Sequence, residues 1–388
     1  LKPCFLMSPM SVAQYLEAEH GRVDRVVFDE AAQIPVWAAS GAIARGKLAV
    51  VVGDPKLLPP TSFFDRGEDE SIEEDEIQDL ESILEECIGA QVPTQRLAWH
   101  YRSRHESLIA FSNERYYDGQ LLTFPSNSSD GLGVSAQFVE GGVYDKGKTR
   151  TNVVEARAVV AEVVRRLSDP AQRERSIGVV TFSQAQQTLI LDLLDEAMRE
   201  HPQIERYFDD ALDESVFVKN LENVQGDERD VIIFSIGYGP DERGRISMNF
   251  GPLNRDGGER RLNVAITRAR EQVVVFSSIR SDQIDLARTG ARAVRDLRAF
   301  LKHAERGQSR DGAGVITHGE DALVQAIAAR LEERGWDVET EVGASAVRVD
   351  LAIRHPDDPE RFLAGIETDG RNYARAATAR DRDRLRAL

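Results

Sequence analysis

Short apolar runs with strand character alternate with longer segments of helical periodicity over most of this chain. Strands are expected at 176–181, 216–219, 231–235 and 272–276, and amphipathic helices at 153–167 and 185–200. Residues 1–64 repeat the alternation on a smaller scale. Strands separated by helices are typical of parallel sheets covered by helices, so an α/β fold is predicted.

Two stretches of unusual composition divide the chain. Residues 65–86 hold twelve acidic side chains and one arginine, as in a solvated loop or helix face, and 80–87 is expected to be helical. Gly, Ser and Asp gather at 308–314 after an expected helix at 282–307, which indicates a linker. We therefore predict five segments: one lobe at 1–64, an acidic connector at 65–92, a second lobe at 93–285, a helix and linker at 286–314, and a small domain at 315–388.

Composition narrows the class of protein. The 388 residues, 41% of them hydrophobic, suffice for two or three cores. No apolar run is long enough to span a bilayer and no secretory leader is visible, so no membrane partner is expected. Two cysteines, Cys4 and Cys87, exclude a disulfide framework or a cysteine zinc site and indicate a reducing cytoplasm. The net charge of −17 argues against a general polyanion-binding surface, although a groove needs only a local basic lining.

Two apolar strands near the start are each followed by carboxylates. Residues 26–28 run into Asp29 and Glu30, and residues 48–52 run into Gly53 and Asp54. Paired carboxylates after a strand suit Mg²⁺ chemistry, because one holds the ion through its water shell while the next orients a water. Taken alone, the Asp29–Glu30 pair is equally well explained as an ordinary strand end.

Two later sequence blocks favour the catalytic interpretation of Asp29 and Glu30 over an ordinary strand end. A Gln-Gly loop runs into an apolar strand at 221–235, and a periodic segment at 262–270 ends in Arg268 and Arg270. Each block is weak evidence alone, and a row of surface ion pairs is the alternative explanation of the two arginines. Together, however, the blocks resemble in type and order the motifs of superfamily 1 helicases of the Upf/Dna2-like branch: 26–33, 48–60, 99–105, 177–186, 221–235 and 262–270.

The resemblance implies two RecA-like lobes of the P-loop NTPase class that clamp ATP and Mg²⁺ and step along single-stranded or forked DNA, or RNA. In the first lobe, Asp29 would hold Mg²⁺, Glu30 would orient the attacking water, and Asp54 would couple the γ-phosphate site to nucleic acid.

The second lobe would supply the residues that respond to the nucleotide. By the same resemblance, Arg102 and Arg268 would act as arginine fingers that stabilise charge in the transition state. Gln225, Gly226 and Glu228 would link the nucleotide state to the bound strand.

Two features depart from the family. Leu57 stands where a glutamine senses the terminal phosphate, which favours an alternative, a catalytically inactive nucleic-acid-binding scaffold of the same fold. The phosphate-cradling loop should precede Asp29 by well over a hundred residues. We therefore expect this chain to be the C-terminal part of a longer protein, to depend on an N-terminal helicase part, and to hydrolyse ATP negligibly alone.

Residues 142–149 fit the phosphate-loop pattern G-x-x-x-x-G-K-T letter for letter. We reject them as a nucleotide site because they follow the Asp29 strand instead of preceding it, and because Asp145 would place a carboxylate beside a phosphate. A better helix start is Asn152, with Glu155 three residues on as in a capping box. An exposed turn is expected here.

The terminal segment predicts a second kind of chemistry. A helix is expected at 319–335, followed by strands at 338–342, 347–353 and 362–370. One carboxylate on the second strand and two on the third, Asp350, Glu367 and Asp369, would converge on one spot. Such a cluster is unfavourable unless a divalent cation neutralises it, so a Mg²⁺ or Mn²⁺ site is predicted.

This segment resembles the PD-(D/E)xK nuclease fold, and most closely the very-short-patch-repair-like endonuclease domains, with 380–386 matching their basic end. The resemblance implies a small restriction-endonuclease-like α/β domain that cuts DNA. Asp369 stands at the place of the usual lysine, so a degraded fold that only binds DNA is the alternative. Glu320 is either a fourth metal contact or a surface glutamate. The whole pattern predicts an ATP-dependent helicase or translocase coupled to a metal-dependent endonuclease-like domain, in DNA repair or phage defence.

Overall fold

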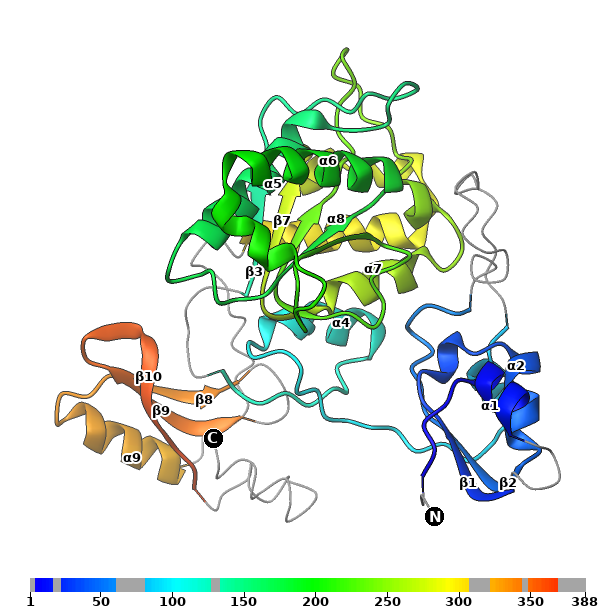
Figure 1. Cartoon of the computed structure of the whole chain (residues 1–388). Coiled ribbons are helices and arrows are strands. Elements are labelled where there is room, and N and C mark those ends of the chain that lie inside the picture. Colours follow the sequence, from blue (N-terminus) through cyan, green and yellow to red (C-terminus); the bar gives the residue numbers. More distant parts are fainter. Residues whose placement is uncertain are drawn as a thin grey trace. The chain divides into compact units, whose positions relative to one another are not determined.

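The structure is a computed structural model that describes residues 4–16, 22–60, 81–126, 133–306, 322–343 and 348–368. The chain divides into two compact units, Leu1–Leu97 and Ala98–Leu388 (Figure 1). Among the described residues, no helix combines the length and apolar character needed to cross a membrane.

The first unit is built on a parallel pair of strands. β1 (Val23–Phe28) pairs with β2 (Gly46–Val51), and the pair is accompanied by α1 (Pro9–Tyr15), η1 (Ala31–Gln33), α2 (Val36–Ile43) and α3 (Ile83–Gly89). Its core joins Phe28 to Ile83 and Leu84 of α3. The helix therefore lies in the predicted acidic connector but packs with the first lobe.

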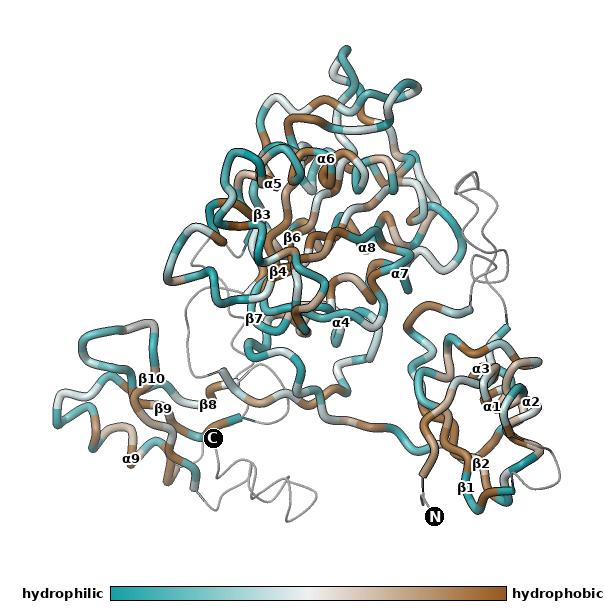
Figure 2. The backbone as a smooth tube through the Cα atoms, viewed as in Figure 1, coloured by the Kyte–Doolittle hydropathy of each residue, from teal (hydrophilic) through white to brown (hydrophobic). Residues whose placement is uncertain are grey.

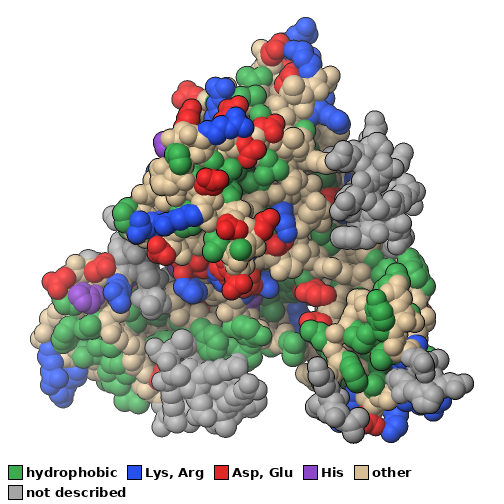
Figure 3. Space-filling model, viewed as in Figure 1, with side chains coloured by type: hydrophobic (Ala, Val, Ile, Leu, Met, Phe, Trp, Pro, Cys, Tyr) green, Lys and Arg blue, Asp and Glu red, His purple; other side chains and the backbone are tan. Residues whose placement is uncertain are grey.

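One face of this strand pair is left open by the described residues. Val27 is 62% exposed and Leu48 is 53% exposed, although both belong to a parallel pair of strands. Hydrophobic side chains are plainly visible on the surface of this unit (Figure 3). Parallel sheets normally have both faces covered by other elements, so this exposed apolar face is suited to packing against further polypeptide.

The second unit contains a sheet of the four predicted strands, joined by a fifth at 134–138 that the apolar runs do not predict. Its described strands are all parallel and lie in the order β3-β7-β6-β4-β5: β3 (Val134–Phe138), β7 (Ala269–Ser277), β6 (Arg229–Ser235), β4 (Ile177–Thr181) and β5 (Phe217–Asn220). The hydrophobic strands run through the middle of the unit, between more polar helices (Figure 2). The predicted α/β class, a parallel sheet flanked by helices, is confirmed.

Helices cover this sheet on both faces. α5 (Val153–Ser168) and α6 (Gln184–Glu200) bury one stripe each against β4, β6 and β7. The other face is covered by α4 (Ser107–Tyr116), α7 (Gly258–Ile266) and α8 (Arg292–Arg306), where the ring of Phe300 packs 6.2 Å from that of Phe234 and 5.4 Å from that of Phe111. The unit is completed by the short turns η3 (Pro202–Phe208), η4 (Gly251–Asn254), η5 (Ser281–Gln283) and η6 (Leu286–Arg288).

The continuous helix expected at 282–307 is wrong in its first ten residues. Only α8, from Arg292 onward, is a long helix, and it follows the separate turns η5 and η6. The Asp285 carboxylate accepts a hydrogen bond from the Ala287 amide and so starts a new turn, and Thr289 and Gly290 then interrupt the helical pattern.

The start of α5 agrees with the prediction, although its capping differs. The Asn152 side chain accepts a hydrogen bond from the Glu155 amide at 3.1 Å. The Glu155 carboxylate, instead of folding back on Asn152, turns into the sheet and accepts from Ser235, Gly237 and Ser278. Burial raises the pKa of Glu155 to about 7 despite these hydrogen bonds.

The C-terminal segment folds as a helix and an antiparallel sheet. α9 (Ala322–Glu332) packs Val324 and Ala328 on Leu351, and the strands lie in the order β10-β9-β8. Their bounds are β8 (Val338–Val342), β9 (Val349–His355) and β10 (Asp358–Ile366). β10 begins four residues before the predicted start at 362, because a tight turn directly joins it to β9. Glu320, Asp369 and the basic run at 380–386 lie outside the described residues.

Candidate functional site

The predicted carboxylates of the first unit lie at one edge of its strand pair. β1 and β2 are parallel, and the two strand ends are tied by hydrogen bonds from the Val52 amide to Phe28 and from the Ala31 amide to Val52. Gly53 allows this approach, since a Cβ there would lie 3.0 Å from the Ala32 nitrogen. Residues that follow β1 and β2 are therefore brought to the same edge.

Asp29 and Glu30 are both exposed at this edge. Asp29 Oδ1 accepts from the Glu30 amide at 3.0 Å, and Glu30 has a left-handed backbone with φ of 50°. Asp54 Oδ1 accepts from the Lys56 amide at 2.8 Å, which fixes the turn that contains Leu57. Accessible carboxylate oxygens are ligands that Mg²⁺ accepts, so the residue types fit the predicted role.

In the second unit, three segments far apart in sequence meet around Arg102. Its Nε donates to Glu228 Oε2 at 2.6 Å, and its Nη1 donates to the Thr267 carbonyl at 3.4 Å. Both contacts are at the N-terminal edge of the sheet, where the Gln-Gly loop enters β6 and α7 ends before β7. The side chain of Arg102 is 35% exposed, so this guanidinium is oriented by the lobe yet still reaches solvent.

His100 lies in the same positively charged environment as Arg102 and Arg268. Its Nε2 lies 2.9 Å from the Ser103 hydroxyl. Burial, together with the charges of Arg102 and Arg268, lowers the pKa of His100 to about 4. The imidazole is therefore neutral at physiological pH and adds no charge to this edge.

The two arginines at the end of the 262–270 block have different surroundings. Arg268 is 4% exposed, and its Nε donates to the Val264 carbonyl at 2.8 Å while its Nη2 donates to the Thr267 hydroxyl. Arg270 forms ion pairs with Glu214 at 2.6 Å and Asp230 at 2.9 Å. The ion-pair explanation is therefore the right one for Arg270. Of the two predicted fingers, Arg102 is the more accessible.

Ion pairs with neighbouring elements hold the Gln-Gly loop in place. Gly226 has a φ of +92°, which lets the chain turn after the half-buried Gln225. Lys219 Nζ lies 2.6 Å from Asp227 Oδ2. Sequence reasoning missed a further contact, in which Arg261 of α7 holds Glu222 at 2.7 Å. The sequence offered one signal for this contact. Arg261 is a charged residue about one helical turn before apolar positions of the 262–270 segment and about two turns before Arg268.

The loop that matches the phosphate-loop pattern closes on its own carboxylate. Asp145 accepts hydrogen bonds from the Thr149 amide at 3.3 Å and the Thr149 hydroxyl at 3.0 Å. Lys148 is 72% exposed and lies 3.7 Å from both Asp145 and Glu242. With an acid already occupying the turn, this loop is a poor place for a phosphate.

Two predicted carboxylates face each other at one end of the C-terminal sheet. The pairing of Ile366 with Leu351 places Glu367 opposite Asp350, on the same face. Asp350 Oδ2 accepts from the Thr368 amide at 2.7 Å and from the Thr368 hydroxyl. Both Glu367 oxygens are buried, and neither meets the geometry of a hydrogen bond with any described residue.

Burial and the charge of Asp350 raise the pKa of Glu367 to about 7, and the Asp350 backbone offsets this only in part. A divalent cation between the two carboxylates would relieve both effects, so the donor set fits Mg²⁺ or Mn²⁺. Within the described ranges no group of three or more possible metal ligands is found, and Asp369 is outside them.

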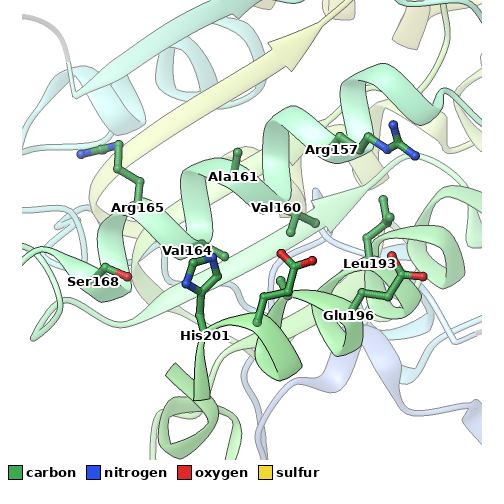
Figure 4. A pocket seen from close by; sticks show the side chains of 11 residues that line it. Arg157, Val160, Ala161, Val164, Arg165, Ser168, Leu193, Glu196 and His201 are labelled. Carbon is green, nitrogen blue, oxygen red and sulfur yellow. The ribbon is translucent and has the colours of Figure 1, made fainter. Parts of the chain in front are cut away.

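A groove of about 540 Å³ lies elsewhere, between α5 and α6 (Figure 4). Arg157, Glu196 and His201 line it with apolar side chains such as Val160 and Leu193. It contains none of the predicted site residues, so the candidate chemistry lies at the sheet edges and not in this groove.

A parallel sheet covered by helices on both faces places this unit in the α/β class of proteins. The family model AAA_12, an AAA domain, matches residues 80–280, just over half of the chain, and the chain therefore belongs to this family. The family model REase_MTES_1575 matches residues 324–388. The predicted resemblance to superfamily 1 helicases with a restriction-endonuclease-like domain is confirmed.

Similar proteins carry helicase names. The chain is 33% identical to the "Uncharacterized ATP-dependent helicase MG140" of Mycoplasma genitalium over 84% of its length, and 33% identical to the homologous protein of Mycoplasma pneumoniae over 88%. It is 24% identical to the Schizosaccharomyces pombe "DNA replication ATP-dependent helicase/nuclease dna2" over 66%. It spans only 29%, 30% and 19% of those proteins.

Proposed function

We propose that this chain forms part of an ATP-dependent helicase or translocase that acts on single-stranded or forked DNA, or on RNA, in the cytoplasm. The observation that carries the proposal is the meeting of Arg102, Glu228 and the end of α7 at one edge of the sheet. Further residues of a longer parent protein would supply the phosphate loop and cover the open face of β1 and β2.

Each predicted residue has a distinct task in this proposal. Asp29 would hold Mg²⁺ and Glu30 would orient the attacking water, from the exposed end of β1. Asp54 would transmit the state of the terminal phosphate to the bound strand. When bound, Mg²⁺ neutralises phosphate charge and orients the nucleotide.

On the second lobe, Arg102 would approach the phosphates with the part of its guanidinium that faces solvent, and Arg268 would support it from the end of α7. Two contacts within the lobe orient Arg102, so little freedom is lost when it meets the nucleotide. Gln225, Gly226 and Glu228 would pass this event to the nucleic acid.

Arg102→Ala in the full-length parent tests the proposal. Nucleic-acid-stimulated phosphate release should fall by about 10³-fold or more, because a guanidinium that stabilises transition-state charge is lost. Arg104→Ala is the matched control, since Arg104 is an exposed arginine of the same segment that pairs with Glu271. Equal turnover in the two variants would refute the assignment of Arg102.

For the terminal domain we propose a metal-dependent endonuclease-like activity. Asp350 and Glu367, with Asp369 as a predicted third ligand, would hold Mg²⁺ or Mn²⁺ against the DNA backbone. The support is the pair of buried Glu367 oxygens beside Asp350. A helicase coupled to such a domain suits DNA repair or phage defence.

Leu57 favours a second candidate, an inactive nucleic-acid-binding scaffold of the same fold. An aliphatic side chain cannot accept a hydrogen bond from water or donate one to a phosphate. A full-length protein that binds single-stranded DNA but releases no phosphate would establish this candidate, and restoration of turnover by Leu57→Gln would show its cause.

A further inference from the structure

Arg261 is a charged side chain in the interior of the second unit. It belongs to α7, and only 2% of its side chain is exposed. Its Nε donates to Glu222 Oε1 at 2.7 Å, and its Nη1 donates to the Asp256 carbonyl at 3.3 Å. The Glu222 side chain is 14% exposed, and its Oε2 is buried without a hydrogen-bond partner in the described parts of the chain.

Such a pair is an inefficient way to stabilise a fold. Two charges lose their hydration, and apolar side chains of similar volume often stabilise the same site equally well or better. The incomplete hydrogen bonding of Glu222 makes the pair less favourable still. The position of the Glu222–Arg261 pair in the fold is therefore a better guide to its role than its contribution to stability.

The pair joins the two segments that carry the candidate site. Glu222 lies three residues before Gln225, and Arg261 lies seven residues, about two helical turns, before Arg268. α7 leads directly to Thr267, whose carbonyl receives Arg102. On the other side of the loop, the ion pair of Lys219 with Asp227 at 2.6 Å ties it to β5.

We propose that Glu222 and Arg261 are positioning residues for the nucleotide response. The ion pair holds the Gln225–Glu228 loop in one register against α7, so that Glu228 keeps its place relative to Arg268. A movement of either segment is then passed to the other. This inference rests on the proposed function, because the segments matter only if the edge responds to a nucleotide.

The test replaces the charges and keeps the packing. In the full-length parent, the double variant Glu222→Leu/Arg261→Met should melt near the wild-type temperature. Its kcat for single-stranded-DNA-stimulated ATP turnover should fall about tenfold, while KM for ATP changes by less than about twofold, because alignment in the transition state is lost and ground-state binding is not.

The chain offers a matched control. Arg166 and Glu162 of α5 form an ion pair at 2.6 Å whose side chains are 6% and 17% exposed. The variant Glu162→Leu/Arg166→Met removes this equally short and similarly buried pair, and with it the more exposed pair of Glu162 with Arg165, away from the candidate site. It should leave kcat and KM unchanged.

Hydrogen exchange on chain 1–388 gives a readout that needs no turnover. The amides of 221–228 should exchange faster in Glu222→Leu/Arg261→Met than in wild type, and those of α5 should not. Should the double variant lose cooperative unfolding, Glu222→Asp replaces it, because it keeps the charge and shortens the reach by one methylene. It too should lower kcat at unchanged KM.

The outcomes separate the two claims. An active wild type whose double variant keeps its kcat, or whose loop exchanges no faster, overturns the positioning role alone. An equal loss of kcat in the α5 control does the same, since it indicates a general effect of losing a buried pair. A full-length wild type without stimulated turnover overturns the proposed function and this inference with it.

Discussion

Two carboxylates in this chain, Glu228 and Glu367, lie in opposite electrostatic situations. Glu228 has Arg102 at 2.6 Å and Arg270 at 3.7 Å, so the lobe neutralises it with its own side chains. Glu367 instead has buried oxygens and the like charge of Asp350 nearby, and its pKa is raised to about 7. The fold neutralises the first carboxylate, whereas burial and the charge of Asp350 disfavour the ionised form of the second.

This difference teaches what each site is built to do. A carboxylate paired with an arginine that still reaches solvent is suited to position that arginine, and it needs no ion in order to fold. A buried pair of carboxylates is unfavourable until a proton or a metal ion arrives. The first site is therefore tested by replacing its arginines. The second is tested by varying the Mg²⁺ or Mn²⁺ in solution.

The largest effect is expected from Arg268→Ala in the full-length parent. Stimulated ATP turnover should fall by about 10³-fold or more, because the buried Arg268 guanidinium supports the stabilisation of transition-state charge at this edge. Arg104→Ala, which removes an exposed ion pair to Glu271, should leave turnover unchanged. Unchanged turnover in Arg268→Ala with a lowered melting temperature would instead make Arg268 a structural residue.

Asp350→Asn should abolish any metal-dependent DNA cleavage by the chain. Mg²⁺ or Mn²⁺ at about 100 times its dissociation constant should stabilise the wild-type domain by about 2.7 kcal/mol, and the variant should gain much less. Melting curves with and without the ion measure this gain. Asp337→Asn, an exposed acid of the same domain, is the control and should keep the full gain. A full gain in Asp350→Asn would remove this residue from the metal site.

The gain from Mg²⁺ should also depend on pH. Because its pKa is raised in the folded state, the Glu367 carboxyl contributes stability that is present below its ordinary pKa of 4.5 and is lost as the pH rises towards about 7. A cation offsets that loss once the group is ionised. The melting-temperature gain should therefore be small at pH 6 and larger at pH 8, and a gain independent of pH would argue against Glu367 as a ligand.

The smallest effect is expected from Lys148→Ala. Chain 1–388 alone should hydrolyse ATP negligibly, since the loop that matches the phosphate-loop pattern closes on the Asp145 carboxylate and so offers no cradle for the β- and γ-phosphates. The variant should therefore match the wild type in a phosphate-release assay. Robust DNA-stimulated turnover that Lys148→Ala abolishes would show that the 142–149 loop is a nucleotide site after all.

Part of the fold follows from the sequence, because β4 and β6 contain continuous apolar runs and helices α5 and α6 begin at side-chain caps. α5 begins where Asn152 and Glu155 predict it, and β4 lies within one residue of its predicted start. The order of the strands does not follow from periodicity alone, and the turns before α8 depend on the local hydrogen bond of Asp285.

The candidate site was predictable in its residues but not in its pairings. The motifs named Arg102 and Glu228, yet their ion pair joins positions 126 residues apart. Arg261 was missed because a buried arginine is unusual, and its partner Glu222 can be recognised only once α7 has packed against the loop. Likewise, the sequence position of Glu155 fits a helix capping box, whereas in the structure its carboxylate accepts hydrogen bonds from Ser235 and Gly237.

Counting bound Mn²⁺ ions tests the contrast between the two carboxylates most directly. Paramagnetic resonance of chain 1–388 titrated with Mn²⁺ at pH 8 should show one bound ion fewer in Glu367→Gln than in wild type. Glu228→Gln should bind the same number as wild type, because Arg102 already neutralises that carboxylate. Equal numbers in wild type and Glu367→Gln, or the loss of an ion in Glu228→Gln, would contradict the account.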